Sequence, residues 1–306
     1  MNKRLKRVAI ISLIVAGALI FGAILLGVAN ALLADGAWTL GWKDFRYDES
    51  GYTVGDGSVH AERVTAIDLD WIDGSVTVVP CDDMFISLSE RAEADLSEAA
   101  ELRWKVDADG TLSVKHRKSQ WFFGLGTNTE KELILRIPRK LFDGMQSISI
   151  EAESASVTVK DVFAKTVEVE LDSGTLTLAG CRAERLSVET ENGAITGEVA
   201  VREHLEIESE NGAIELQFAE LPHTSNVKTE NGKVTLLLSR DANVTLTWQT
   251  ERGQLSYDLP LIVQHEQGLL SDDLPFVQNG RYVLGNGAHQ INVQTKRGNL
   301  LVTSHP

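Results

Sequence analysis

The sequence feature most suited to chemistry is a set of carboxylates at fixed distances from glycines. One acid lies two positions before each glycine, or before the alanine that takes the place of the first glycine. These acids are Glu153, Asp172, Glu191, Glu210, Glu230 and Glu251. Two positions further back lie Glu151, Glu170, Glu189 and Glu208, and one more step adds Glu168 and Glu206. Strand residues two apart face the same side, so these acids would share one face of a β-sheet.

Two interpretations of this acidic face stay open. Carboxylates on neighbouring strands lie about 4.8 Å apart, and at that distance they repel by only about 0.9 kcal/mol per pair in water. A solvated face that keeps the domain soluble is therefore tolerable. Alternatively, the face binds cations, with Ca²⁺ shared between carboxylates at roughly millimolar affinity, because each ion would have few protein ligands. A basic peptide or polymer is a further candidate, and no other cofactor is predicted.

A second candidate site combines basic and aromatic residues in the segment 115–126. Its members are Lys115, Arg117, Lys118, Trp121, Phe122 and Phe123. Cations beside aromatic rings can contact an anionic membrane or a protein partner. A long hairpin tip folded over the end of the domain explains the same residues without a function.

Motifs of common catalytic sites are absent from the sequence. The seven histidines lack metal-ligand spacing, and no phosphate-binding glycine loop or nucleophile elbow is found. Cys81 and Cys181 are compatible with isolated core thiols or with one disulfide. We therefore predict no catalytic residue. A polysaccharide-active enzyme that uses paired carboxylates is the less favoured alternative, because acids are too abundant here to single out a pair.

The carboxylates belong to an internal repeat. The segments 167–177, 186–196, 205–215 and 226–235 share alternating apolar residues on both sides of Asn-Gly or Ser-Gly. The glycine position recurs at 174, 193, 212, 232 and 253, which gives periods of 19, 19, 20 and 21 residues. Weaker copies surround Gly74, Ala155 and Gly298. Alternation with a period of two predicts half-buried strands, so each repeat is a strand, a turn and a strand.

Two all-β architectures fit this pattern. Asn-Gly between alternating strands is typical of antiparallel hairpins, whereas near-constant periods favour a parallel β-solenoid with 19–21-residue repeats. We favour the solenoid. It predicts that Asn192, Asn211 and Asn231 stack as a ladder and that the glycines supply positive-φ corners. With repeats stacked in chain order, Glu251 would be the neighbour of Glu230.

The N-terminal residues predict a membrane anchor. Residues 1–7 hold four cations and no anion, and the 27 residues from 8 to 34 carry no charge. About 20 apolar residues span a bilayer, and the flanking cations place the N-terminus in the cytoplasm. A cleaved signal peptide is the alternative, because Ala29-Asn30-Ala31 offers a small-x-small cleavage site. We expect a juxtamembrane linker over 35–63 and the solenoid over 64–302, with 81–145 elaborated by hairpins.

The charge of the chain restricts its partners. The 306 residues include 29 Lys and Arg against 44 Asp and Glu, a net charge of −15. Without the four N-terminal cations, the part beyond the anchor carries 25 − 44 = −19. Nucleic acid is therefore excluded as a general partner.

The repeat resembles a known family. The Glu-Asn-Gly and Asp-Ser-Gly turns, the run 253–260, Gly285-Asn286-Gly287 and the closing strand 291–300 are similar to the bacterial putative adhesins, domain of unknown function 4097. Arg252 and Arg297 depart from the pattern, because Asn or Ser is typical there. The resemblance implies a right-handed β-helix-like surface domain, commonly on one N-terminal anchor, without established catalytic residues.

Together these observations predict a non-catalytic, adhesin-like binding protein of the bacterial cell envelope. It would be a single-pass membrane protein with an extracytoplasmic C-terminal domain and a protein or glycan partner. An accessory regulator of an envelope-stress system is the alternative function.

Overall fold

The computed structural model describes residues 45–119, 130–269 and 277–305. The chain forms two compact units, Met1–Glu49 with Ser119–Thr129, and Ser50–Lys118 with Glu130–Pro306. In the first unit the rings of Phe45 and Tyr47 meet edge to face, with centroids 5.7 Å apart. The Tyr47 amide donates a hydrogen bond to Ser119 Oγ at 3.2 Å. Every strand of the described residues belongs to the second unit.

Several predicted features lie outside the described residues. They are the basic tail 1–7, the anchor 8–34, and Trp121, Phe122 and Phe123. Within the described ranges, no helix has the length and apolar character needed to cross a membrane. The anchor and its orientation stay predictions.

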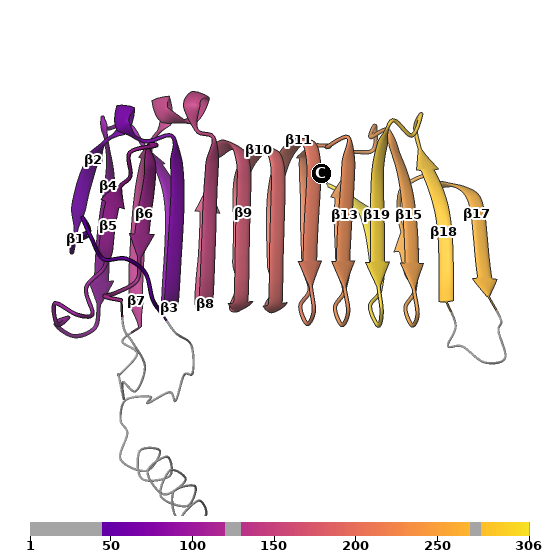
Figure 1. Cartoon of the computed structure of the whole chain (residues 1–306). Coiled ribbons are helices and arrows are strands. Elements are labelled where there is room, and N and C mark those ends of the chain that lie inside the picture. Colours follow the sequence, from indigo (N-terminus) through magenta and orange to yellow (C-terminus); the bar gives the residue numbers. More distant parts are fainter. Residues whose placement is uncertain (1–44, 120–129, 270–276, 306) are drawn as a thin grey trace, which may run out of the picture. The chain divides into compact units, whose positions relative to one another are not determined.

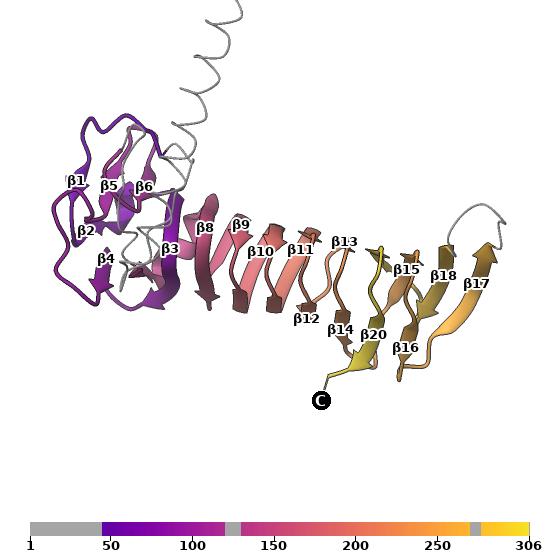
Figure 2. The same ribbon diagram turned by 90° about the horizontal axis from the view of Figure 1, so that it is seen from below.

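The centre of the second unit is a stack of rungs that place strands in two facing sheets (Figures 1 and 2). Its strands are β8 (Ser147–Lys160), β9 (Phe163–Ser173), β10 (Leu176–Asn192), β11 (Ile195–Ser209), β12 (Ile214–Glu220), β13 (Thr224–Thr229) and β14 (Val234–Leu238). The first sheet contains β9 and β13, and the second contains β12 and β14; β8, β10 and β11 bend and serve both. Neighbouring rungs pair in parallel, as Leu176 does with Val157 and Ile195. The predicted all-β, parallel stacking is confirmed, and the hand of the coil stays a prediction.

Apolar columns fill the space between the sheets. Alternate residues of each strand point inward, so equivalent positions of successive rungs stack on one another. One column of the first sheet consists of Leu69, Ile150, Val169, Val188, Ile207, Val227, Val293 and Trp248, all buried. Each such side chain contributes about 1.5–3 kcal/mol of burial free energy. The outward residues are left free to carry the charges and hydroxyls discussed below.

The N-terminal end of the stack combines the long strand β3 with shorter elements. They are β1 (Thr53–Val54), β2 (Gly57–His60), η1 (Ala61–Arg63), β3 (Ala66–Cys81), β4 (Phe85–Ala92), β5 (Arg103–Val106), β6 (Thr111–Lys115), β7 (Lys131–Pro138) and η2 (Arg139–Gly144). β3 pairs in parallel with β8 and forms the first full rung, and β4 and β5 add antiparallel pairings to β7 and β6. Part of the expected linker over 35–63 is folded here, because β1 pairs with β5 and β2 pairs with β4.

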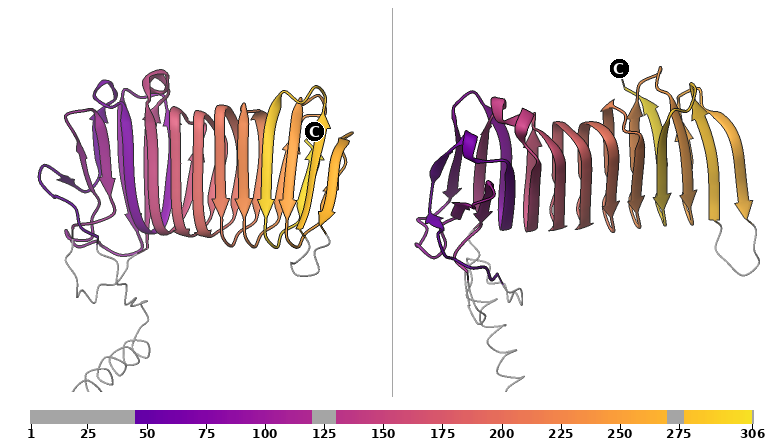
Figure 3. Two further views of the ribbon diagram at one scale, coloured as in Figure 1. Left: turned by 45° about the vertical axis from the view of Figure 1, so that its right-hand side comes forward. Right: turned by 45° about the horizontal axis from the view of Figure 1, so that its top comes forward.

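The C-terminal rungs do not follow chain order. The elements are β15 (Val244–Thr250), β16 (Leu255–Tyr257), β17 (Ile262–Leu269), β18 (Val277–Leu284), β19 (His289–Thr295) and β20 (Leu300–Ser304). β19 lies between β13 and β15 (Figures 1 and 3), and β20 lies between β14 and β16 (Figure 2). The rung of β19 and β20 is the last in sequence, but in the stack it lies between the rung of β13 and β14 and the rung of β15 and β16. The expected stacking of Glu251 directly on Glu230 is wrong for this reason.

The expectation that the glycines between the two sheets have positive φ angles is wrong for most corners. Gly193, Gly212 and Gly232 do not have positive φ angles; among the predicted corners Gly74 and Gly174 do, at +96° and +131°. The corner glycines are required because a Cβ on Gly212 would lie 1.8 Å from the Gly193 carbonyl oxygen. The predicted asparagine ladder is confirmed: Asn211 donates to Asn192 at 3.1 Å, and Asn231 donates to Asn211 at 2.9 Å.

Candidate functional site

The acidic residues line the outward face of the first sheet. Strand register places Glu151, Glu170, Glu189 and Glu208 in one row across β8 to β11. Glu168 and Glu206 lie in the adjacent row, separated by Ser187. Glu153, Asp172, Glu191, Glu210 and Glu230 follow one another beside the corners. Three parallel rows therefore form what we call the acidic face, as the repeat predicts.

Lysines neutralise both ends of the central row. Lys228 occupies the repeat position that follows Glu208, whereas Lys115 comes from β6, outside the repeat. At one end, Lys115 Nζ lies 3.2 Å from Asp68 and 3.6 Å from Asp70, and Asp70 pairs in register with Glu151. At the other end, Lys228 forms an ion pair with Glu208. Asp68 and Asp70 were missed as members of the face, although they alternate before Gly74 as the repeat requires. The carboxylates of Glu151, Glu170 and Glu189 lie between these neutralised ends.

The corner row ends differently from expectation. Lys296 of the inserted rung takes the place beside Glu230, and its Nζ lies 3.1 Å from the Glu230 carboxylate. Glu251 is the neighbour of Lys296 on the other side, since the Arg252 amide donates to the Lys296 carbonyl. The acidic face consequently ends in alternating charges, because the rung order places a lysine between the two acids.

Asp70 is the most perturbed carboxylate of the acidic face. Burial raises the pKa of Asp70 to about 6; Lys115 opposes this shift, and Glu151 and Asp68 add to it. The Asp70 side chain is 28% exposed. The folded chain therefore holds the Asp70 proton more tightly than the unfolded chain, whose value is near 3.8. The stability that this carboxyl contributes is present below pH 3.8 and is lost as the pH rises through about 6.

Substituting Asp70→Asn should stabilise the protein at pH 7.5, because the amide avoids the cost of a buried charge. The difference between the pKa of about 6 in the folded chain and 3.8 in the unfolded chain corresponds to an upper value of about 3 kcal/mol, and partial exposure reduces the expected gain to about 1–2 kcal/mol. The gain should vanish well below pH 3.8, for example at about pH 3, where the carboxyl is protonated in both states. Denaturant unfolding at both pH values measures it, with Glu168→Gln on an exposed position of the same face as the control. Destabilisation at pH 7.5 would show that the ion pair with Lys115 outweighs the burial cost.

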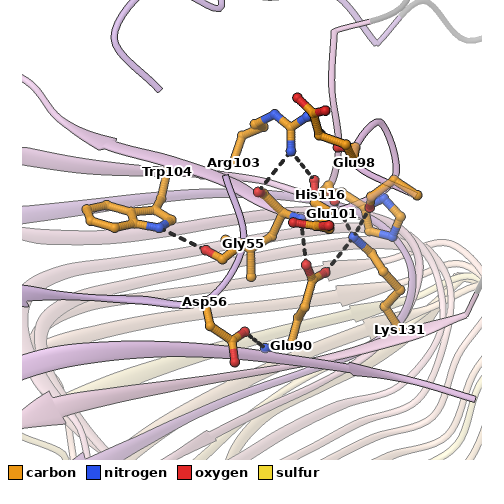
Figure 4. Close-up of polar contacts among 11 residues, drawn as sticks. Gly55, Asp56, Glu90, Glu98, Glu101, Arg103, Trp104, His116 and Lys131 are labelled. Carbon is orange, nitrogen blue, oxygen red and sulfur yellow. Dashed lines mark hydrogen bonds and ion pairs between the residues drawn. The ribbon is translucent and has the colours of Figure 1, made fainter. Parts of the chain in front are cut away.

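A buried polar network closes the N-terminal end of the stack (Figure 4). Lys131 Nζ lies 2.8 Å from Glu90 Oε2 and also donates to the carbonyls of Ala100, at 2.6 Å, and His116. The second Glu90 oxygen accepts from the Leu102 amide at 2.8 Å. The side chains of Lys131 and Glu90 are 1% and 7% exposed. Because both side chains are almost fully buried and bonded to each other, this pair joins β4 to β7 and positions these strands.

Two further groups extend this network. Arg103 donates to the carbonyls of Glu101, at 2.9 Å, and Glu98, at 2.5 Å. The His116 ring packs edge-on against Trp71 at 4.5 Å, and burial, followed by the charge of Lys131, holds the pKa of His116 well below its usual range. Sequence reasoning missed this cluster, because its members come from β4, β5, β7 and two loops that share no spacing.

The predicted basic and aromatic loop is only partly described. Lys115 is engaged by Asp68 and Asp70 and belongs to the acidic face. Arg117 is half-buried, and burial lowers its pKa while Glu153 opposes that shift. Lys118 is exposed. The three basic residues therefore do not form one basic surface.

The structure offers little support for other site chemistry. Among the described residues, no three His, Cys, Asp or Glu side chains group closely enough to hold a metal ion. Cys81 and Cys181 are free thiols. Burial raises the pKa of Cys181 to about 12, so this core thiol is unreactive.

Comparison with known proteins agrees with the fold. The chain matches the Toastrack DUF4097 family over residues 64–303. The protein belongs to this family. The matched Toastrack region begins two residues before β3 and ends within β20, so it includes the rungs and the inserted C-terminal rung.

Two solved structures show a distant similarity to this Toastrack protein. One is described as a putative cell adhesion protein from Clostridium sporogenes ATCC 15579, with 12% identity over 83% of this chain and 100% of that one, and a TM-score of 0.35. The other is described as a putative adhesin from Bacteroides fragilis NCTC 9343, with 11% identity over 83% of this chain and 97% of that one, and a TM-score of 0.34. No curated protein gave a match.

Proposed function

We propose that this Toastrack protein is a non-catalytic binding protein of the bacterial cell envelope. Residues 8–34 hold it in the cell membrane, residues 1–7 stay in the cytoplasm, and the solenoid lies outside. The charge-free segment and the cations before it support this orientation. Membership of a family associated with adhesins supports the binding role.

The observation that carries the binding role is the unneutralised middle of the acidic face. Glu151, Glu170 and Glu189 occupy successive strands about 4.8 Å apart. The sheet holds them in register, so a partner does not have to order them. A flexible basic chain can place successive cations along such a row. We therefore propose a basic peptide or polymer as the partner, with Ca²⁺ as a weaker ligand of the same carboxylates.

A lysine-rich peptide should bind the full chain, and the triple variant Glu151→Gln/Glu170→Gln/Glu189→Gln should weaken binding about tenfold. Three exposed ion pairs at about 0.2–1 kcal/mol each account for that factor. Binding is measured by fluorescence anisotropy of decalysine on the protein in membrane vesicles, where resistance to carbonate washing also tests the anchor. Affinity should fall as salt is raised.

The matched control is Glu198→Gln/Glu215→Gln/Glu220→Gln, which removes the same charge from exposed positions of the second sheet. Equal loss in both variants would show an unspecific charge effect and would contradict the proposed site. Millimolar Ca²⁺ serves as a second probe, and an unchanged thermal midpoint would exclude the metal as a ligand.

A further inference from the structure

The outward face of the second sheet carries hydroxyls in register. Thr77, Thr158, Thr177 and Thr196 form one row across β3, β8, β10 and β11. A second row lies two residues earlier, where Ser75 pairs with Ser156, and Thr175 Oγ1 lies 3.2 Å from Ser156 Oγ. Ser156, Thr175, Thr177 and Thr196 are exposed. We call these two rows the hydroxyl face; they lie on the sheet opposite the acidic face.

A charged residue lies at one end of each row of the hydroxyl face. In the threonine row, the neighbour of Thr196 on the adjacent strand β12 is Glu215. In the serine row, the neighbour of Ser75 on the adjacent strand β7 is Glu132. The threonine row has four members and extends over about 15 Å at the spacing of neighbouring strands, and the serine row has three members, Ser75, Ser156 and Thr175. The uncharged stretch is therefore long enough for several units of a linear polymer.

A groove opens at the β7 end of the hydroxyl face. It has a volume of about 600 Å³, within the range of small-molecule sites. Ser75 and Ser156 line it together with Asp73, Glu132, Arg91 and Glu93. The groove thus combines hydroxyls with carboxylate acceptors and a guanidinium donor, and it is continuous with the serine row.

We propose that the hydroxyl face and its groove bind an uncharged linear polysaccharide that lies along the stack. Sugar hydroxyls both donate and accept hydrogen bonds, and so do Ser and Thr hydroxyls. Threonine methyl groups offer apolar contact to sugar rings. The carboxylates of the groove favour a ligand without negative charge. This inference rests on the proposed binding role and names a second partner class on a separate face.

The test uses the full chain in membrane vesicles and three soluble probes: cellohexaose, hexameric N-acetylglucosamine and, as the acidic comparison, a galacturonate hexamer. Binding is followed by isothermal titration calorimetry. At least one neutral probe should bind, and the galacturonate probe should bind at least tenfold more weakly. The variant Thr158→Val/Thr177→Val/Thr196→Val should weaken neutral binding at least tenfold, because valine keeps the shape and strand preference but loses the hydroxyl.

The matched control is Ser149→Val/Ser187→Val/Thr247→Val, which removes three hydroxyls from outward positions of the first sheet and should leave neutral binding unchanged. Glu132→Gln tests the groove and should weaken binding without unfolding the chain. Failure of both neutral probes to bind, or equal binding by the threonine variant, would overturn the proposal. Displacement of the sugar by decalysine would instead identify the groove as a peptide site. Decalysine binding to the acidic face is measured on the same variants, so the two proposals can fail independently.

Discussion

Replacing Lys131 with methionine should lower the free energy of unfolding by about 3–5 kcal/mol, the cost of leaving a buried charge without its partner. Lys131 Nζ satisfies the Glu90 carboxylate and the carbonyls of Ala100 and His116. The ammonium group also lies 5.0 Å from the centre of the Trp71 ring. Methionine fills similar space but donates no hydrogen bond, so all three acceptors lose their donor. Urea unfolding of the full chain measures the loss.

A second variant separates the charge from the packing. Lys131→Met/Glu90→Gln removes both charges, while the glutamine oxygen can still accept from the Leu102 amide. The double variant should recover at least half of the lost stability. Lys105→Met is the matched control, because Lys105 forms a partly exposed pair with Asp107 at 3.0 Å, and it should cost less than about 1 kcal/mol. A similar small loss for Lys131→Met would show that the buried pair contributes no net stability.

Substituting Gly212→Ala should cost about 3 kcal/mol or more, because neighbouring rungs would have to separate at the corner. The new Cβ would lie 1.8 Å from the Gly193 carbonyl oxygen and 2.9 Å from Ser209 Oγ. Separation also disturbs the adjacent asparagine ladder, in which Asn211 bonds to both neighbours. At about 2–4 °C per kcal/mol for a chain of this size, the thermal midpoint should fall by roughly 6–12 °C.

Substitutions at two other glycines serve as controls for this prediction. Gly144→Ala places a Cβ with nothing within 4 Å and should be neutral or slightly stabilising. Gly197→Ala meets Leu216 Cδ2 at 3.2 Å, the end of a flexible side chain, and should have an intermediate effect. If Gly212→Ala were as stable as Gly144→Ala, close packing of the corners would not be the reason for glycine there.

The strand pattern and the acidic rows could be predicted because both depend on local spacing. Apolar residues at every second position define the inward side of a strand, and a constant period aligns equivalent positions of successive rungs. Glu170 and Glu189 are 19 residues apart and lie side by side for this reason. The same argument applies to the asparagine ladder.

The contacts made by the N-terminal strands could not be predicted in this way. Lys115 reaches Asp68 and Asp70 because β6 pairs in parallel with β3, although β6 belongs to an antiparallel hairpin with β5 that breaks the repeat. The buried pair of Lys131 and Glu90 likewise joins β7 and β4, which pair antiparallel. These strands share no period with the rungs, so sequence spacing does not bring them together.

The sequence by itself determined an all-β chain with strands at a near-constant period; once that period is taken as stacked rungs, it also places the acidic face and the residues of the corner ladder. The tertiary structure alone decided the order of the last rungs. Gly253 and Gly298 present equivalent corners, and either could lie on Gly232; in the fold Gly298 does, and Gly253 lies on Gly298. The pairing of β19 with both β13 and β15 sets that order. The physical reason is that alternation and period are local properties of the chain, whereas the choice between two equivalent rungs depends on packing between segments far apart in sequence.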